Sequence, residues 1–304
     1  MQNILDKIFQ IAIEIDELIK TSSTGKIEDS QNSSGEVQAK LDVLSDILVE
    51  TKLKELGSSP LGKGIIGEFG GIKSIVSEEK PGIIEVNKSG KYLIAYDPLD
   101  GSSLIDVNLS VGTIFGIYEN DFNGKNLVAS AYIVYGPRVE VVFADENGVK
   151  FYRKNTPLLT KEGLGVVFEE ITLEKLNNRG KILSPGAQNS LWPKYHKNLI
   201  NNFWEEGYKL RYSGGMVPDL HQILLKGGGL FTYPELKGKQ NGKLRKLFEV
   251  FPFAFIFEKL GGQAIDKNGT RILDLGYEKL HESTSCYFGS EYEIDKVKDF
   301  LTKK

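Results

Sequence analysis

Hydrophobic residues near the N-terminus recur at steps of three and four positions, the spacing that places side chains on one face of a helix. Six apolar residues follow this spacing, namely Ile4, Ile8, Ile11, Ala12, Ile15 and Ile19. The pattern predicts a helix over residues 4–19 that packs one face against the core.

A second helical pattern begins near residue 40 and would bury Leu41, Leu44 and Leu48 on one face. Between the two helices, residues 21–36 contain a single large apolar residue. Such a segment cannot bury enough surface to hold itself in place, so we expect a mobile loop there.

Clusters of β-branched and aromatic residues predict that strands dominate the first half of the chain. The expected strands cover residues 72–77, 83–86, 92–96, 112–118, 128–135, 138–144 and 149–153. The segment Asp145–Gly148 ends in Asn-Gly and predicts a hairpin between the last two strands.

The second half has a mixed pattern, with helices expected at 195–206 and 244–260 and a strand at 208–212. Gly261 and Gly262 would end the last helix with a left-handed cap. Because strands and helices do not alternate strictly, the pattern favours layered sheets of the α/β class (α+β type), with a domain boundary near 165–180.

Composition limits the class of protein further. The chain has 304 residues and a formal net charge of −3, which gives no global attraction to nucleic acid or to an anionic membrane. No apolar run approaches the roughly 20 residues that cross a bilayer, and the N-terminus lacks the features of a signal peptide. Because Cys286 is the single cysteine, we expect no internal disulfide, a cytoplasmic location and a core position for its side chain.

Two local patterns concern ligands. Basic residues are densest at Lys237, Lys239, Lys243, Arg245 and Lys246. They could attract an anionic ligand, or they could line a solvated loop. The segment 62–67 spells the dinucleotide fingerprint Gly-x-Gly-x-x-Gly, but no strand pattern feeds it, so a nucleotide site is disfavoured.

The most informative segment is Tyr92–Ser103, YLIAYDPLDGSS, in which an apolar strand runs into Asp97 and Asp100. Two neighbouring carboxylates at a buried strand end either share a proton or bind a hard cation, and Mg²⁺ suits such oxygen ligands. The small residues 101–103 could turn backbone N–H groups toward a phosphate. A turn with solvated acids is the alternative.

Two other acidic sites fit a shared metal. Glu78 and Glu79 follow the apolar run IKSIV, and Glu249 interrupts the apolar run LFEVFPFAFIF. Buried carboxylates are rarely left without partners, although a solvent-facing Glu249 is the alternative. The three histidines, at positions 196, 221 and 281, lack the spacing of a zinc site, and no Gly-x-Ser-x-Gly elbow indicates a serine hydrolase.

Together these motifs resemble the magnesium-dependent, lithium-sensitive sugar phosphatases, and more narrowly the class I fructose-1,6-bisphosphatases. The segments that carry the resemblance are GEVQAKLDVLSD (35–46), VSEE (76–79), DPLDGSSLIDVNLSVGTIFGIY (97–118), RYSGGM (211–216) and NGKLRKLFEVFPFAFIFEKLGG (241–262). The resemblance implies a layered αβαβα fold with two mixed sheets. It also implies an N-terminal domain over 1–172 with the metal site and a dynamic loop, and a C-terminal substrate-binding domain over 173–304.

The resemblance also implies roles for particular residues. The metal ligands would be Glu78, Asp97, the Leu99 carbonyl, Asp100 and Glu249. Glu36 and Asp42 would be acids of the dynamic catalytic loop, and Asp42 with Glu79 would take the proton from the attacking water. The substrate contacts would be Asp100, Gly101, Ser102, Ser103, Tyr212, Tyr233, Lys243 and Arg245, with Arg211 supplied across a subunit interface of a homotetramer.

The implied reaction is hydrolysis of the 1-phosphate of D-fructose 1,6-bisphosphate, in gluconeogenesis or carbon fixation, with Mg²⁺ or Mn²⁺. Ser184-Pro185-Gly186 resembles sedoheptulose-1,7-bisphosphatases instead, so that enzyme or a dual-substrate enzyme is the alternative. Lys91 and Tyr92 match part of the family's AMP site, and the segment 57–71 has no assigned role. A sugar-phosphate sensor without turnover and a nicotinamide enzyme are weaker alternatives.

Overall fold

The computed structural model describes residues 1–22, 26–31, 37–58, 71–155, 158–160, 163–165 and 167–303. Two of the sequence features named above, Glu36 and the Gly-x-Gly-x-x-Gly segment 62–67, lie outside these residues. In the part of the chain that the structure describes, no helix combines the length and the apolar character needed to cross a membrane.

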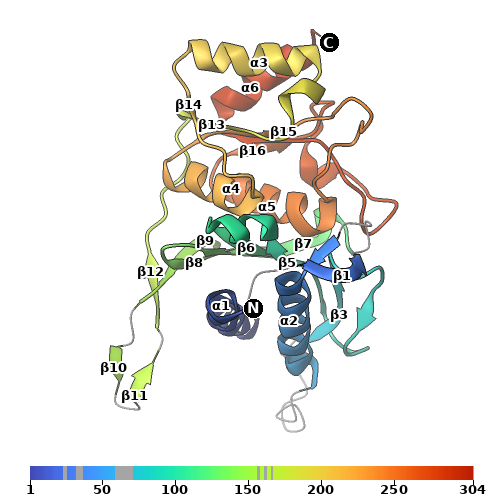
Figure 1. The fold of residues 1–304 in the computed structure, drawn as a ribbon, viewed down its shortest axis with the longest axis vertical. Helices are drawn as coiled ribbons and strands as arrows, with labels where there is room; N and C mark the ends of the chain where they lie inside the picture. The colour runs from blue at the N-terminus through green and yellow to red at the C-terminus, as the bar shows by residue number, and fades with distance from the viewer. Residues whose placement is uncertain are drawn as a thin grey trace.

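Helices and sheets alternate in layers along the long axis of the molecule (Figure 1). The helices are α1 (Gln2–Thr21), α2 (Lys40–Ser58), α3 (Lys194–Glu205), α4 (Met216–Leu225), α5 (Phe251–Lys259) and α6 (Glu291–Leu301). Helices α1 and α2 cover the outer face of a large sheet, α4 and α5 lie between the two sheets, and α3 and α6 cover a smaller sheet. This order confirms the predicted αβαβα class.

The large sheet has eight strands in the order β12-β9-β8-β7-β6-β5-β3-β4. Its strands are β3 (Ile72–Ser77), β4 (Ile84–Glu85), β5 (Tyr92–Asp100), β6 (Val111–Glu119), β7 (Leu127–Tyr135), β8 (Val139–Asp145), β9 (Gly148–Lys154) and β12 (Phe168–Ile171). All neighbours are antiparallel except β3 and β5, which run parallel. The carboxyl ends of β3 and β5 therefore meet at one edge of the sheet.

The smaller sheet has five strands in the order β14-β13-β15-β17-β16, with both parallel and antiparallel pairs. Its strands are β13 (Ile182–Pro185), β14 (Lys209–Leu210), β15 (Gly229–Tyr233), β16 (Gln263–Ile265) and β17 (Cys286–Gly289). Two small antiparallel pairs complete the strands, namely β1 (Lys26–Gln31) with β2 (Val37–Ala39) and β10 (Leu158–Thr160) with β11 (Gly163–Gly165).

The principal core lies between the two sheets and is built around α5. Phe251, Phe253 and Phe257 on this helix are all fully buried, because a helix that is apolar on every side must be covered on every side. The same hydrophobic cluster includes Ile114 from the large sheet and Phe288 from the small one. The division at residues 172 and 173 stays a prediction.

Most expected elements are present, with differences in two helices. The first helix and the seven predicted strands of the large sheet are confirmed, whereas β12 was not predicted. In α2 only Leu41 of the three predicted leucines is buried. Leu44 and Leu48 are partly exposed, because the face of α2 that meets the sheet also carries Asp42 and Asp46. The helix expected from residue 244 begins as a π-helical turn at Lys246–Val250 and becomes α-helical only in α5.

Other differences concern one predicted loop and two further helices. Part of the predicted loop 21–36 forms strand β1, so the loop prediction is wrong for residues 26–31. The sequence analysis also missed α4 and α6. Gly261 has φ 85° directly after α5, as expected of a left-handed cap, and Cys286 is a buried free thiol, as expected of a core residue.

Candidate active site

The carboxyl ends of the parallel strands β3 and β5 bring two acidic segments together. Ser77, the last residue of β3, pairs in register with Tyr96 of β5, and the Glu78 N–H donates to the Tyr96 carbonyl at 3.0 Å. Glu78 therefore lies beside Asp97, although 19 positions separate the two in the sequence. Parallel pairing is the reason, since it aligns the two strand ends.

A β-bulge in β5 determines where the two aspartates point. Asp97 pairs with Ile114 of β6, whereas Asp100 pairs with Gly112, so β5 has one extra residue in this interval. Without the extra residue, two side chains three positions apart would point to opposite faces of the sheet. The bulge turns Asp97 and Asp100 to the same face, toward the layer of α4 and α5.

The third acidic segment is the π-helical turn before α5. The Arg245 N–H donates to Glu249 Oε2 at 2.5 Å, so the Glu249 carboxylate folds back over the start of the turn. Glu78, Asp97 and Glu249 each place one carboxylate oxygen within 4.8 Å of the other two, and all three residues are buried. Three oxygen donors at this spacing fit a hard divalent cation such as Mg²⁺.

Asp100 lies in the same cavity but has different contacts. Its carboxylate accepts from the backbone N–H of Met216 at 3.3 Å and of Val217 at 2.6 Å, at the N-terminus of α4. Gly112 makes this close approach feasible, because a Cβ at that position would lie 2.4 Å from Val217 Cγ1. The structure thus places Asp100 outside the three-carboxylate group, and its role as a ligand stays a prediction.

Helix α4 is itself fixed to the large sheet by a buried polar contact. His221 Nε2 lies 2.8 Å from Glu140 Oε2, and Tyr132 OH lies 3.0 Å from His221 Nδ1. The contact ties the helix to β7 and β8. His221 therefore has a structural role in the packing of α4 on the large sheet.

Burial changes the acidity of the carboxyl groups in this cavity. Loss of water around Glu249 raises its pKa to about 7, against the opposing charge of Arg245. Burial likewise raises the pKa of Asp100 to about 6, although the Val217 and Met216 N–H groups favour its charged form. Burial and then the negative charges of Asp100 and Glu249 raise the pKa of Asp97 well above its usual value. A nearby cation would stabilise the charged forms of these buried carboxyl groups.

The cavity around these carboxylates has a volume of about 290 Å³ and also contains basic and aromatic side chains. Arg245 forms a buried ion pair with Glu78 through Nη1 and Oε1. Lys243 is exposed at the wall, and Tyr233 and Tyr212 line the side that faces the small sheet. The cavity therefore combines a negative end, which fits a metal, with positive groups, which fit the phosphates of a ligand.

Backbone N–H groups at one wall provide another anion contact. Gly101 adopts φ 78°, and the 3₁₀ helix Ser102–Val107 begins directly after it. The first N–H groups of a helix have no partner within that helix, so those of Ser102 and Ser103 are available to a ligand in the cavity. Gly101, Ser102 and Ser103 all line the cavity, as expected of a phosphate cradle.

The remaining predicted residues are placed as follows. Asp42 and Glu79 line the cavity, and Asp42 is 8% exposed. Arg211 is exposed and does not line the cavity of its own chain; its guanidinium donates to the Leu210 carbonyl at 3.0 Å. Glu36 lies outside the described residues. The roles assigned to all four residues stay predictions.

The sequence analysis missed part of the cavity wall. Gly214, Gly215 and Met216 line it, although only Arg211 and Tyr212 were selected from the motif RYSGGM. Asp219 holds this wall in place by accepting from the Ser213 N–H at 2.8 Å. The available signal was GGMVPD, in which glycines precede an apolar helix with an acid in its first turn.

Comparisons with known proteins agree with this geometry. The family model described as fructose-1-6-bisphosphatase, N-terminal domain, matches residues 1–158, and the model of the C-terminal domain matches residues 176–302. A class 1 fructose-1,6-bisphosphatase of Helicobacter hepaticus is 48% identical over 298 residues, which cover 97% of this chain and 98% of the relative.

Solved structures show the same fold. The holo form of fructose-1,6-bisphosphatase from Leishmania major superimposes with a TM-score of 0.83 at 30% identity, covering 99% of this chain and 93% of that one. A putative sedoheptulose-1,7 bisphosphatase from Toxoplasma gondii superimposes with a TM-score of 0.81 at 28% identity, covering 99% and 94%. With matches to both domain models and a close relative along nearly its whole length, this chain belongs to the fructose-1,6-bisphosphatase family.

Proposed function

We propose that this protein hydrolyses the 1-phosphate of D-fructose 1,6-bisphosphate to give fructose 6-phosphate and phosphate, with Mg²⁺, or alternatively Mn²⁺, as cofactor. One observation carries the proposal: a single cavity contains three clustered carboxylates, Glu78, Asp97 and Glu249, together with the cations Lys243 and Arg245. Carboxylates alone would repel a phosphate ester, but with a divalent cation between them they bind one. The names of the relatives support the choice of sugar.

We assign the metal to Glu78, Asp97, Asp100, Glu249 and the Leu99 carbonyl. When bound, a divalent cation would polarise the phosphate and acidify the attacking water. The raised pKa values of Asp97, Asp100 and Glu249 support this assignment, because burial has made the charged carboxylates dependent on a counter-charge.

Other residues of the protein would transfer the proton and hold the phosphate. Asp42 with Glu79 would accept the proton of the attacking water, and Glu36 would be a further catalytic acid on the dynamic loop. The N–H groups at 101–103 would hold the phosphate that is cleaved, and Arg245 would neutralise its oxygens. Because Asp42, Glu79 and Arg245 line one cavity, little reorganisation of these three side chains would be needed for an in-line attack on phosphorus.

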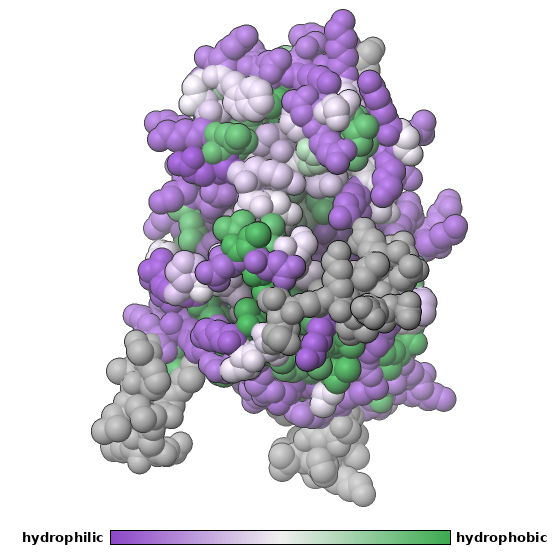
Figure 2. Space-filling model, in the orientation of Figure 1, coloured by the Kyte–Doolittle hydropathy of each residue, from purple (hydrophilic) through white to green (hydrophobic). Residues whose placement is uncertain are grey.

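Tyr212, Tyr233 and Lys243 would contact the sugar and its second phosphate. Arg211 would act in the cavity of a neighbouring subunit, which makes a homotetramer part of the proposal. An exposed apolar patch over the 3₁₀ helix Ser102–Val107 supports association (Figure 2), since Val107 is 65% exposed. A cytoplasmic location and a role in gluconeogenesis or carbon fixation complete the proposal.

A sedoheptulose-1,7-bisphosphatase, or an enzyme that accepts both sugars, is the second candidate. The observation that favours it is Ser184-Pro185-Gly186 at the end of β13. Gly186 lies so close to Tyr233 that a Cβ would be 2.6 Å from the ring, so this segment packs directly against a residue that lines the cavity. The similarity to the Toxoplasma gondii structure, which is named a putative sedoheptulose-1,7 bisphosphatase, also favours this candidate.

The test is phosphate release from the two bisphosphates, measured side by side with and without Mg²⁺. We expect release from fructose 1,6-bisphosphate that depends on the metal and greatly exceeds release from fructose 6-phosphate. Release from the seven-carbon sugar alone would establish the second candidate instead. Binding of both sugars without release would indicate a sensor, and binding of a dinucleotide would reopen the nicotinamide alternative.

A further inference from the structure

A buried acid on α2 that has no role in the scheme above lies one helical turn after Asp42. Asp46 is only 3% exposed, and three donors surround its carboxylate. Oδ1 accepts from Ser77 Oγ at 2.5 Å and from Tyr96 OH at 3.0 Å, and Oδ2 pairs with Lys80 Nζ at 2.8 Å. A buried carboxylate with all these partners is a specific arrangement, since removing any one leaves a polar group without compensation.

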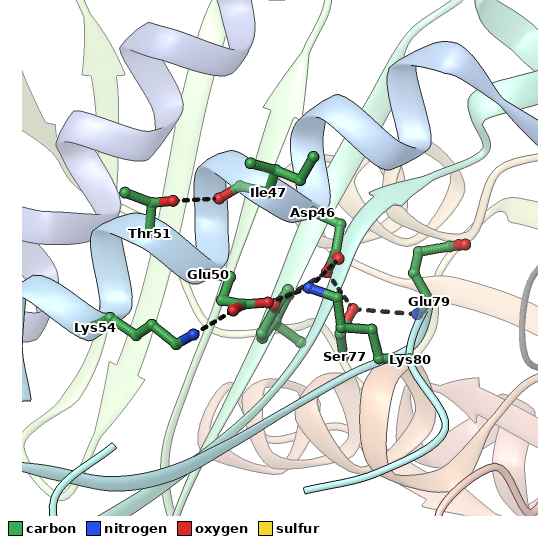
Figure 3. Close-up of polar contacts among 9 residues, drawn as sticks. Asp46, Ile47, Glu50, Thr51, Lys54, Ser77, Glu79 and Lys80 are labelled. Carbon is green, nitrogen blue, oxygen red and sulfur yellow. Dashed lines mark hydrogen bonds and ion pairs between the residues drawn. The ribbon is translucent and has the colours of Figure 1, made fainter. Parts of the chain in front are cut away.

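Figure 3 shows that Asp46 on α2, Ser77 at the end of β3 and Lys80 in the turn after it point their side chains toward one another. Lys80 also pairs with Glu50, one turn further along α2, and Glu50 Oε1 accepts from Lys54 Nζ at 2.5 Å. Lys80 thus joins the turn to two acids on the same face of α2. The acids at i and i+4 are spaced to share one cation.

Ser77 links Asp46 to the backbone of the turn that carries Glu78 and Glu79. Ser77 Oγ donates its single proton to Asp46 and accepts from the Glu79 N–H at 3.1 Å. His281 Nε2 lies 2.9 Å from the Lys80 carbonyl on the other side. The turn that carries Glu78 and Glu79 is therefore fixed through its own backbone, as well as through the side chains of the cavity.

Asp46 thus connects three elements, each of which contributes at least one acid to the cavity. Helix α2 carries Asp42, the turn after β3 carries Glu79, and β5 carries Asp97 next to Tyr96. The roles that the resemblance implies do not include Asp46. Outer contacts that orient the groups around a metal commonly control activity.

We propose that Asp46, acting through Ser77 and neutralised by Lys80, is a positioning residue that sets the relative placement of Asp42 and Glu79. This inference rests on the proposed function, in which these two acids accept the proton of the attacking water. Asp46 itself does not line the cavity. Its effect is transmitted through one hydroxyl and one backbone N–H.

The experiment compares Asp46→Asn, Ser77→Ala and the double variant with wild type. Asparagine can keep the contacts of Oδ1 but presents a donor to Lys80, whereas alanine removes only the hydroxyl between Asp46 and Glu79. We expect each single variant to lower kcat about 10- to 100-fold, with a change in substrate KM below about threefold. Because the two residues act in series, the double variant should be no slower than the slower single variant.

A second measurement does not depend on turnover. In metal-free protein, both single variants should speed hydrogen exchange at the Glu79 amide, which loses or loosens its contact with Ser77 Oγ. Lys52→Gln is the matched control, because it removes an ion pair between α2 and Glu14 of α1 that involves neither Asp46 nor Lys80, and it should change neither kcat nor the exchange rate.

Folded Ser77→Ala or Asp46→Asn protein with wild-type kcat and wild-type exchange at Glu79 would overturn the proposal. Losses in kcat that multiply in the double variant would also overturn it, because they would show independent effects. If wild-type protein releases no phosphate, the proposed function fails, and the exchange measurement still decides whether Asp46 fixes the turn.

Discussion

Replacing Glu249 with glutamine is expected to have opposite effects on stability in the absence and in the presence of metal. The Arg245 N–H, which donates to Glu249 Oε2 at 2.5 Å, can donate equally to an amide oxygen, so the turn before α5 keeps its contact. What changes is the charge. The variant no longer places a carboxylate that burial disfavours beside Asp97 and Glu78.

The size of the metal-free effect follows from the pKa of Glu249, which burial raises from 4.5 to about 7. Between these two values the folded protein binds more protons than the unfolded chain, so the free energy of unfolding falls as pH rises through this window. The full loss is present above pH 7 and amounts to about 3 kcal/mol, at about 1.4 kcal/mol per pKa unit. Glutamine does not titrate and avoids this loss.

We therefore expect metal-free Glu249→Gln protein at pH 8 to be more stable than wild type by up to about 3 kcal/mol, or roughly 5 °C in Tm. Near pH 4 the two proteins should unfold alike. Adding Mg²⁺ at about 1,000 times its Kd should reverse the order at pH 8, because it would stabilise the protein that binds it by about 4.1 kcal/mol.

Thermal unfolding of both proteins from pH 4 to pH 8, with Mg²⁺ or with a chelator, measures these differences. Glu258→Gln, which alters a surface pair with Arg271, is the matched control and should show no dependence on metal. The reasoning is wrong if metal-free Glu249→Gln is no more stable than wild type at pH 8, or if Mg²⁺ stabilises both proteins equally.

Three other substitutions test the cavity. Asp97→Asn should lower Mg²⁺-dependent phosphate release at least about 100-fold while the circular dichroism spectrum is retained; near-normal turnover would contradict its role as a ligand. Gly112→Ala should cost about 1–3 kcal/mol in thermal unfolding, because its Cβ would lie 2.4 Å from Val217 Cγ1, whereas Gly82→Ala, with open space around it, should change little. Lys243→Met should raise the substrate KM roughly tenfold with little change in kcat, and an unchanged KM would remove Lys243 from the substrate contacts.

The spacing of apolar residues along the sequence predicted the bounds of several helices and strands closely. Strand β3 has the predicted bounds 72–77, and α1 extends the predicted helix 4–19 by two residues at each end. Periodicity was less reliable in α2, where the predicted face was Leu41, Leu44 and Leu48. The inner face of α2 carries Asp42 and Asp46 as well, and a count of apolar residues cannot recognise a buried acid whose partners come from other elements.

The acids of the candidate site were selected from sequence motifs, but the motifs do not place them. Glu78 and Asp97 meet because β3 and β5 run parallel, and Asp97 and Asp100 share a face because of one extra residue in β5. The structure also bonds the Asp100 carboxylate to the N-terminus of α4, a helix that the sequence analysis had missed.

The sequence by itself therefore determined the class of fold, the family and the chemical character of the site, because these depend on residue types and on short-range spacing. Only the tertiary structure decided which carboxylates face one another, which cations lie among them, and that Asp46 joins α2 to the acidic turn. Those facts depend on strand pairing, on a bulge and on close approach between segments far apart in the chain. Each is settled by the packing of the whole molecule.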